Sequence, residues 1–403
     1  MRGLFKVAMT AAVALSLCLL AVAIVQSQAT PPPPSEAPAG FDNLTNGFLI
    51  QQDFDEFKDQ FEEVEGPDKG LGPLYNATAC VDCHQNPVTG GNSQVTELRA
   101  GRYDGANFTP HPGGSLIHDR AIDKSIQPRV LGIDNVRALR SSLSVLGDGF
   151  IEAIADSTLI AISNSQPPGM QGTVVMVPVL EANGALRVGR FGWKDQHASL
   201  ESFSADAYVN EMGITSPLQP QETTFDGASV AAFDELPDPE NDGNDVREFA
   251  NFMRSTKVPP RLNANSVDAI AGSKLFTNAG CVICHVPTIV TAPAGTYIIN
   301  GGTFVVDAAL GNKVIHPYSD FLLHDVGTGD GIVQNGGPDT QYKLRTPPLW
   351  GLRARARFMH DFQSLTLPQA LRRHGVEAQS VIDYFNSLST SEQRQLIAFL
   401  NSL

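Results

Sequence analysis

Hydrophobic residues recur at helical spacing in several parts of this chain. Phe54, Phe57 and Phe61 are three or four residues apart, which places them on one face of an amphipathic helix. The same periodicity predicts helices over 246–253 and 266–276 and near the C-terminus. There Ser389-Thr390-Ser391-Glu392 is a capping box, and apolar residues follow on one face up to residue 403.

One segment has a strand pattern instead. Valines dominate residues 174–180, and after Asn183-Gly184 the apolar residues continue at Leu186 and Val188. Asn-Gly between two such runs predicts a β-hairpin with a type I′ turn. Residues 90–114 are rich in Gly, Asn, Pro and Thr, which favours irregular backbone. We expect 136–162 to be mainly helical, with an interruption at 147–149.

The N-terminus has the features of an export signal. Arg2 and Lys6 precede an apolar run over 7–25, and Ser27-Gln28-Ala29 offers small residues for cleavage before Thr30. We expect residues 1–29 to be a Sec-type signal peptide and the protein to be periplasmic. Because the run is long, an uncleaved membrane anchor is the alternative.

Composition limits the possible partners. The formal net charge is −15, and a chain this acidic is repelled by phosphate backbones, so we expect no nucleic-acid partner. It could attract a basic redox protein, although solubility alone also explains such a charge. A membrane becomes a partner only if the N-terminal segment is uncleaved.

The clearest chemical signal is a five-residue string that occurs twice. Cys-x-x-Cys-His is present at 80–84 and at 281–285. This is the attachment motif of c-type haem, in which two thiols bind the porphyrin covalently and the histidine ligates the iron. A four-cysteine zinc site needs its pairs much closer together, and a redox-active Cys-x-x-Cys would need a βαβ neighbourhood. The predicted attachment residues are Cys80, Cys83, Cys281 and Cys284, and the predicted iron ligands are His84 and His285.

These observations together predict a fold class and a domain division. A helix before Cys-x-x-Cys-His and a late helix packed across it is the plan of a small cytochrome c domain. We expect a mainly α fold with two such haem domains and a β-hairpin insertion in the first. The expected divisions are signal peptide 1–29, Pro-rich linker 30–45, N-terminal haem c domain 46–240 and C-terminal cytochrome c domain 241–403.

Several further segments resemble the di-haem oxidoreductase family, which is related to bacterial di-haem cytochrome c peroxidases. The resemblance extends from about residue 46 to the end of the chain. It is carried by the segments Gly70–Asn76, Gly189–Lys194, Asn210–Ser216, Tyr318–Asp325, Arg345–Leu352 and Met359–Asp361.

The chain departs from the family pattern in two places. Residues 163–172 and the following hairpin replace an Asp/Gly-rich loop. In addition, Phe362 follows His360-Asp361 where many members have glycine. The first departure affects loop contacts, and the second affects the edge of the second haem pocket.

The resemblance implies a sixth ligand for the second haem. His374 occupies the place where related di-haem enzymes carry the sixth ligand of the electron-transfer haem, and two imidazoles would leave that iron no free position. Met359, another histidine or no ligand are the alternatives. For the first haem, His111 and His118 are candidates, although each is more simply a histidine in a polar loop.

Glu152 is the candidate catalytic residue. It lies among apolar residues, which disfavour a charged carboxylate, and the resemblance places an acidic residue at about this distance after the first haem motif. Such a group could move protons during peroxide cleavage. The alternative is a buried carboxylate that pairs with an arginine such as Arg129 or Arg140.

Three other residues have candidate roles. Arg345 is expected to pair with a haem propionate, or otherwise with an acidic side chain. Trp193 and Trp350, the two tryptophans of the chain, could relay electrons between the haems or simply pack.

The resulting functional prediction is an exported, peroxidase-like di-haem oxidoreductase. Haem one would be reactive and haem two would transfer electrons, with hydrogen peroxide as oxidant and a redox protein as electron donor. Two covalent haem c groups are the expected cofactors, and calcium is a possible addition. The alternative is a di-haem electron carrier without catalytic activity; thiol oxidation is weak because every cysteine outside 1–29 belongs to a haem motif.

Overall fold

The computed structural model describes residues 33–298 and 304–403. The predicted signal peptide therefore lies outside the described residues. Within the described part, no helix has both the length and the apolar character needed to cross a bilayer. Residues Ser35–Leu403 form one compact unit, and the division near residue 240 stays a prediction.

The described helices are distributed along the whole chain. They are α2 (Gln51–Glu62), α3 (Asp148–Glu152), α4 (Asp156–Ser165), α5 (Leu200–Ala207), α6 (Asn244–Ser255), α7 (Val267–Asn278), α8 (Leu367–Arg372), α9 (Gln379–Ser387) and α10 (Thr390–Leu400).

The strands form several small sheets rather than one large one. They are β1 (Ser35–Glu36), β2 (Leu74–Tyr75), β3 (Thr96–Tyr103), β4 (Phe108–Pro110), β5 (Leu116–Ile117), β6 (Arg120–Ala121), β7 (Val136–Ser141), β8 (Met176–Val179), β9 (Ala185–Val188), β10 (Ile289–Val290), β11 (Lys313–Ile315), β12 (Leu323–His324) and β13 (Leu344–Arg345).

The expectation of a mainly α fold is wrong. Helical turns of all kinds contain 31% of the described residues, and strands together with isolated bridges contain 16%. The largest sheet pairs β3 with β4, β5 and β7 in antiparallel register, in a region that the sequence patterns predicted to be irregular or helical. These strands carry charged residues such as Glu97, Arg99 and Arg140, so they lack the apolar alternation of a half-buried strand. Their pairing is long-range, which local patterns do not report.

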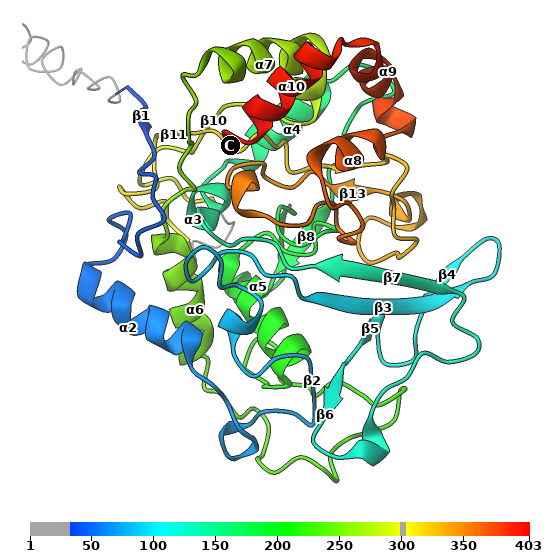
Figure 1. The fold of residues 1–403 in the computed structure, drawn as a ribbon. Coiled ribbons are helices and arrows are strands. Elements are labelled where there is room, and N and C mark those ends of the chain that lie inside the picture. Colours follow the sequence, from blue (N-terminus) through cyan, green and yellow to red (C-terminus); the bar gives the residue numbers. More distant parts are fainter. Residues whose placement is uncertain (1–32, 299–303) are drawn as a thin grey trace, which may run out of the picture. The chain divides into compact units, whose positions relative to one another are not determined.

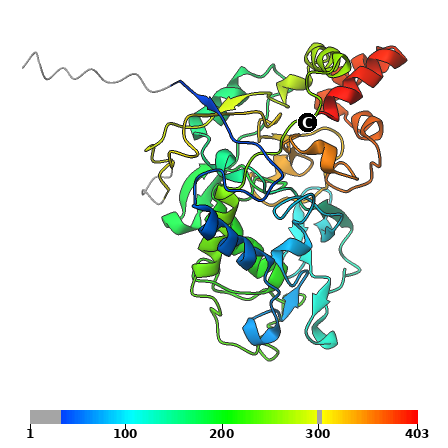
Figure 2. The same cartoon turned by 60° about the vertical axis from the view of Figure 1, so that its left-hand side comes forward.

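Most individual helix predictions are confirmed. α2 packs on α6 through Phe54, Phe61 and Phe252, whose ring centroids are 4.8–5.4 Å apart, and the two helices lie side by side in Figures 1 and 2. α10 begins with the predicted capping box at Ser389. The 136–162 prediction is wrong over β7 and right over α3 and α4.

The hairpin and one helix crossing also agree with the sequence. β8 pairs with β9, which confirms the hairpin. The predicted two-residue type I′ turn is wrong, because Val179 pairs with Ala185 and residues 180–184 form a longer loop: a 3₁₀ turn (Leu180–Ala182) followed by Asn183 and Gly184 with positive φ. α7 and α10 cross closely at Gly272, where a Cβ atom would lie 2.0 Å from the Gln395 carbonyl oxygen. A side chain at residue 272 would therefore separate the two helices.

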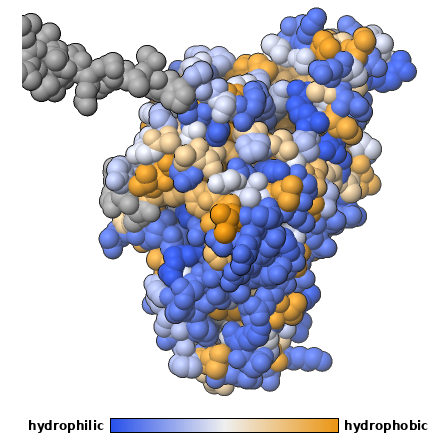
Figure 3. Space-filling view, turned by 90° about the vertical axis from the view of Figure 1, so that its left-hand side faces the viewer, coloured by the Kyte–Doolittle hydropathy of each residue, from blue (hydrophilic) through white to orange (hydrophobic). Residues whose placement is uncertain are grey.

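Buried residues form two main clusters. The larger joins α2, α3, α5, α6 and the β8–β9 hairpin, and the smaller joins α7, α9 and α10. The face that contains α2 is largely hydrophilic, with hydrophobic residues scattered over it in small groups (Figure 3). Each cluster adjoins one Cys-x-x-Cys-His motif, because Phe61 lies 6.2 Å from the His84 ring and Phe276 lies 6.1 Å from the His285 ring.

Candidate di-haem site

Both Cys-x-x-Cys-His motifs have the same local structure. Each begins with a short helical turn, Cys80–Asp82 in one and Cys281–Ile283 in the other. The four cysteines are free thiols. Burial raises the pKa of Cys80, Cys83 and Cys281 to about 12. Thiols of this kind are protonated at neutral pH, which disfavours thiolate redox chemistry.

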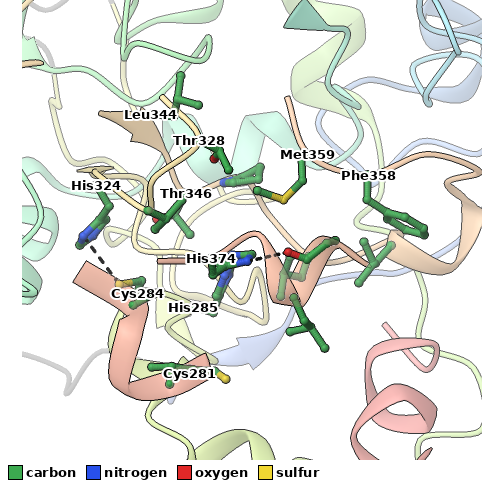
Figure 4. A pocket seen from close by; sticks show the side chains of 18 of the residues that line it. Cys281, Cys284, His285, His324, Thr328, Leu344, Thr346, Phe358, Met359 and His374 are labelled. Carbon is green, nitrogen blue, oxygen red and sulfur yellow. Dashed lines mark hydrogen bonds between the residues drawn. The ribbon is translucent and has the colours of Figure 1, made fainter. Parts of the chain in front are cut away.

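The second motif opens into a narrow, apolar cavity, which we call cavity two. Its volume is about 170 Å³. Cys281, Cys284 and His285 line it, and so does the predicted ligand His374. Figure 4 shows both imidazoles in this cavity, together with Met359.

The hydrogen bonds of the two histidines suit iron ligation. His285 Nδ1 donates to the Tyr318 carbonyl oxygen at 3.0 Å, and His374 Nδ1 donates to the Ala370 carbonyl oxygen at 2.9 Å. A carbonyl accepts only, so Nδ1 carries the proton and Nε2 keeps a free lone pair. Burial lowers the pKa of both, that of His285 to about 4, and a neutral imidazole is the form that binds a metal. This donor set fits a haem with two imidazole ligands.

Charged groups surround the Cys284 side of cavity two. His324 Nε2 lies 2.8 Å from Asp320 Oδ2, and His324 Nδ1 lies 2.7 Å from Glu377 Oε2 and 3.7 Å from Cys284 Sγ. The dashed line to Cys284 in Figure 4 marks the last of these contacts. His324 therefore links the attachment cysteine to two buried or half-buried carboxylates.

The first motif opens into a much larger cavity, which we call cavity one. Its volume is about 1190 Å³, and Cys83 and His84 line it. Burial lowers the pKa of His84 to about 4, so this imidazole is also neutral and able to bind a metal. A smaller apolar pocket of about 80 Å³ adjoins Cys80, Cys83 and His84. Two thiols and an imidazole at the edge of so large a space fit a second covalent haem.

Carboxyl groups distinguish the wall of cavity one. Glu97 on β3 and Glu211, in a turn of π-helix (Tyr208–Met212) after α5, both line it. Burial and the charge of Glu97 raise the pKa of Glu211 to about 8. Asp148 at the start of α3 also lines the cavity, and burial raises its pKa to about 7. Two carboxyl groups of this wall can therefore hold a proton near neutral pH.

Glu152 lies outside the linings of both cavities. It is fully buried, and Arg254 donates to it through Nε at 2.7 Å and through a terminal nitrogen at 3.0 Å, while the Leu200 amide donates at 2.8 Å. Burial alone would raise the pKa of Glu152, but the charge and hydrogen bonds of Arg254 outweigh burial and lower it. These contacts favour the ion-pair alternative, with Arg254 as partner rather than Arg129 or Arg140. The catalytic role stays a prediction without support from this geometry.

Sequence reasoning missed Glu211. The sequence did contain a clue to Glu211, because this residue belongs to the segment Asn210–Ser216 that resembles the family. Hydrophobic spacing could not identify it, because its environment is created by β3 and by the loop at Asn76, far away in the chain. Asn76 Nδ2 donates to Glu211 Oε2 at 2.8 Å.

The two histidines that the sequence offered as ligands of the first haem, His111 and His118, lie in different surroundings. His111 is held between Asp134 at 2.8 Å and Asp226 at 2.9 Å and lies outside the lining of cavity one. His118 is part of that lining, and its Nε2 donates to the Asn210 carbonyl oxygen at 2.9 Å. Its role as a ligand stays a prediction.

Trp193 and Arg345 line both cavities. The indole nitrogen of Trp193 donates to the Ser141 carbonyl oxygen at 2.8 Å. Arg345 Nε donates to the Gly192 carbonyl oxygen at 2.7 Å, and its nearest carboxylate, Asp195, is 3.8 Å away. Trp350 is buried in the larger core cluster.

Nothing in the haem sites bears on the prediction that the protein binds calcium. Four carboxylates in the described part of the chain, Glu222, Asp234, Asp238 and Glu240, have oxygens within 4.8 Å of one another. Calcium stays a prediction.

The comparison with protein families agrees with the haem assignment of these motifs. Residues 117–403 match the family model described as "Di-haem oxidoreductase, putative peroxidase". No curated protein matches the chain.

Solved structures that match the chain include three whose matches cover nearly all of it. A MauG-like protein associated with microbial copper homeostasis is 14% identical, with 94% of this chain and 95% of that chain covered and a TM-score of 0.42. The diheme peroxidase BthA from Burkholderia thailandensis E264 is 14% identical, with 93% and 95% covered and a TM-score of 0.41. Hydrazine synthase from Kuenenia stuttgartiensis is 13% identical, with 94% and 98% covered and a TM-score of 0.38.

The family model covers well over half of the chain, including the second Cys-x-x-Cys-His motif and the segments that end at Ser216, Asp325, Leu352 and Asp361. The chain therefore belongs to the di-haem oxidoreductase family.

Proposed function

We propose that this protein reduces a peroxide at haem one and supplies the electrons through haem two. The contrast between the two cavities carries this proposal. Cavity one has a volume of about 1190 Å³ and a wall with protonated carboxyl groups, whereas cavity two has about 170 Å³ and contains a second imidazole. A small oxidant has room beside haem one, while the second imidazole of cavity two would occupy the free position of haem two.

In this proposal haem two is bound by Cys281 and Cys284 and ligated by His285 and His374. Ligation from both sides suits electron transfer, because it leaves the iron no position for a substrate. Arg345 is assigned to a haem propionate. Its Nε is used by the Gly192 carbonyl oxygen, so the two terminal nitrogens of the guanidinium are the donors for a carboxylate.

Haem one is bound by Cys80 and Cys83 and ligated by His84. A bound haem supplies the iron that accepts and donates electrons in this chemistry. Reduction of hydrogen peroxide to two waters consumes two electrons and two protons, so the site must deliver protons. Glu211 meets this need, because its carboxyl group holds a proton up to a pH of about 8. We assign to Glu211 the protonation of the leaving oxygen of the peroxide.

Trp193 is an aromatic residue shared by the walls of the two cavities. It lines both cavities and packs edge-on against His360 at a centroid distance of 6.0 Å. Trp350 lies outside the lining of both cavities, so Trp193 is the better candidate for an electron relay.

The cellular setting follows from the sequence rather than from the described residues. We propose a periplasmic protein that receives electrons from a redox protein, because two haem-attachment motifs and a predicted export signal occur in the same chain. Membrane attachment applies if residues 1–29 remain uncleaved.

The ferric absorption spectrum of the purified di-haem protein tests the proposal. We expect one high-spin haem that shifts on addition of cyanide, one low-spin haem that does not, and peroxide consumption with a reduced donor. Two low-spin haems that respond to neither cyanide nor peroxide would identify the protein as an electron carrier and overturn the proposal.

A further inference from the structure

The wall of cavity one contains a second carboxyl group next to Glu211. The side chains of Glu97 and Glu211 line the same wall and interact electrostatically, although they come from β3 and from the π-helical turn after α5. Two buried carboxyl groups that share a site do not both ionise easily, because their negative charges repel. One proton between the two groups is therefore the favoured state at neutral pH.

The surrounding donors decide which member is charged. Arg99 binds Glu97 in a bidentate manner, with Nε to Oε1 at 2.7 Å and a terminal nitrogen to Oε2 at 3.0 Å. Arg140 adds a second positive charge, because it lies opposite Glu97 in the β3–β7 register. Glu211 receives a hydrogen bond from the neutral amide of Asn76. The negative charge therefore belongs to Glu97 and the proton to Glu211.

Other charged groups near the pair do not reverse this assignment. Asp206 on α5 interacts with Arg99 and with His197. His118 is neutral at physiological pH, because burial lowers its pKa to about 4. The Cys83 thiol is protonated before haem attachment and uncharged after it.

We propose that Glu97 is a positioning residue for the acid of cavity one: Arg99 holds it ionised, and it keeps the proton on Glu211. This inference rests on the proposed function, in which Glu211 protonates the leaving oxygen of a peroxide. A single isolated glutamate would lose its proton several pH units lower. Glu97 thus determines the pH range over which Glu211 is protonated and can act as an acid.

The test is an infrared pH titration of the ferric di-haem protein. The protonated carboxyl band of Glu211 is assigned by its loss in Glu211→Gln. In the wild type this band should disappear with a midpoint near pH 8. In Glu97→Gln the midpoint should fall by roughly one to three pH units, because a neighbouring negative charge is gone. The alkaline limb of peroxide turnover should move by the same amount.

Two further variants separate this effect from a structural one. Glu97→Asp keeps the charge and should keep the midpoint near that of the wild type. Arg99→Gln removes a positive charge that stabilises the doubly ionised pair and should move the midpoint upward, so it provides a test with the opposite sign if Glu97→Gln does not fold. Glu201→Gln is the matched control, because Glu201 lies on α5 outside the lining of cavity one.

The outcomes distinguish this inference from the proposed function. An unmoved infrared midpoint in both Glu97→Gln and Arg99→Gln overturns the role of Glu97, even if the wild type reduces peroxide. A wild type that does not reduce peroxide overturns the proposed function, while a shifted midpoint in the same protein still establishes the carboxyl pair.

Discussion

The two haem motifs share five-residue patterns and local backbone, but their surroundings differ. Around His285 the cavity is narrow and apolar, and a second imidazole from the segment after α8 enters it. Around His84 the cavity is about seven times larger and has Glu97, Arg99 and Glu211 in its wall. In the proposed function, the Cys-x-x-Cys-His motifs position the two haems, and the opposite wall of each cavity determines what that haem can do.

The two cavities differ in polarity because different secondary-structure elements form their walls. Cavity two is lined by loop residues between 280 and 360 and by apolar residues of α7, α8, α9 and α10, whose apolar faces pack together. One wall of cavity one comes from the antiparallel sheet of β3, β5 and β7, whose backbone is satisfied by strand pairing. Such a sheet can present charged side chains to an internal space when they pair with one another, as Glu97 and Arg99 do.

The largest expected effect is that of Glu211→Gln. Peroxide turnover should fall by about 10²–10⁴-fold, the usual contribution of a general acid or base, while both haems remain bound. Steady-state turnover with a reduced donor measures this, and Glu201→Gln is the control. If Asp148→Asn lowers turnover and Glu211→Gln does not, Asp148 is the proton donor instead of Glu211.

His374→Ala should make the two sites more alike. Without its second imidazole, the low-spin haem of cavity two should become high-spin and should bind cyanide, while the spectrum of haem one stays the same. Absorption and electron paramagnetic resonance spectra measure the change. Met359→Leu is the comparison variant: a spectral change there, with none in His374→Ala, would make Met359 the ligand.

Glu152→Gln should affect stability rather than turnover. It leaves Arg254 buried without its carboxylate, which costs about 3 kcal/mol of unfolding free energy. Chemical denaturation measures this loss, and peroxide turnover should remain near that of the wild type. Slow turnover in a variant of unchanged stability would instead restore the catalytic role that the sequence suggested.

The pH dependence of this loss has a definite sign. The folded pKa of Glu152 is lowered, so its stabilising contribution is complete above its unfolded pKa of about 4.3 and disappears as pH falls through the folded value. The stability difference between the wild type and Glu152→Gln should therefore be largest at neutral pH and should shrink in acid.

The sequence by itself determined the features that depend on neighbouring residues. The two attachment motifs, α2, α6, α7, the β8–β9 hairpin and the Ser389 capping box follow from spacing and local hydrogen bonding. The family followed from short segments in a constant order. His374 could be named from its place in that order, and the structure places it in the same cavity as His285.

The tertiary structure decided what depends on residues far apart in the chain. Glu152 and Glu211 are both glutamates among apolar neighbours in sequence, yet Arg254 lowers the pKa of one, while burial and Glu97 raise the pKa of the other. Neither partner is within 40 residues of the glutamate that it affects. The charge state of a buried carboxyl group depends on which charges the fold brings within a few ångströms, and local sequence does not contain that information.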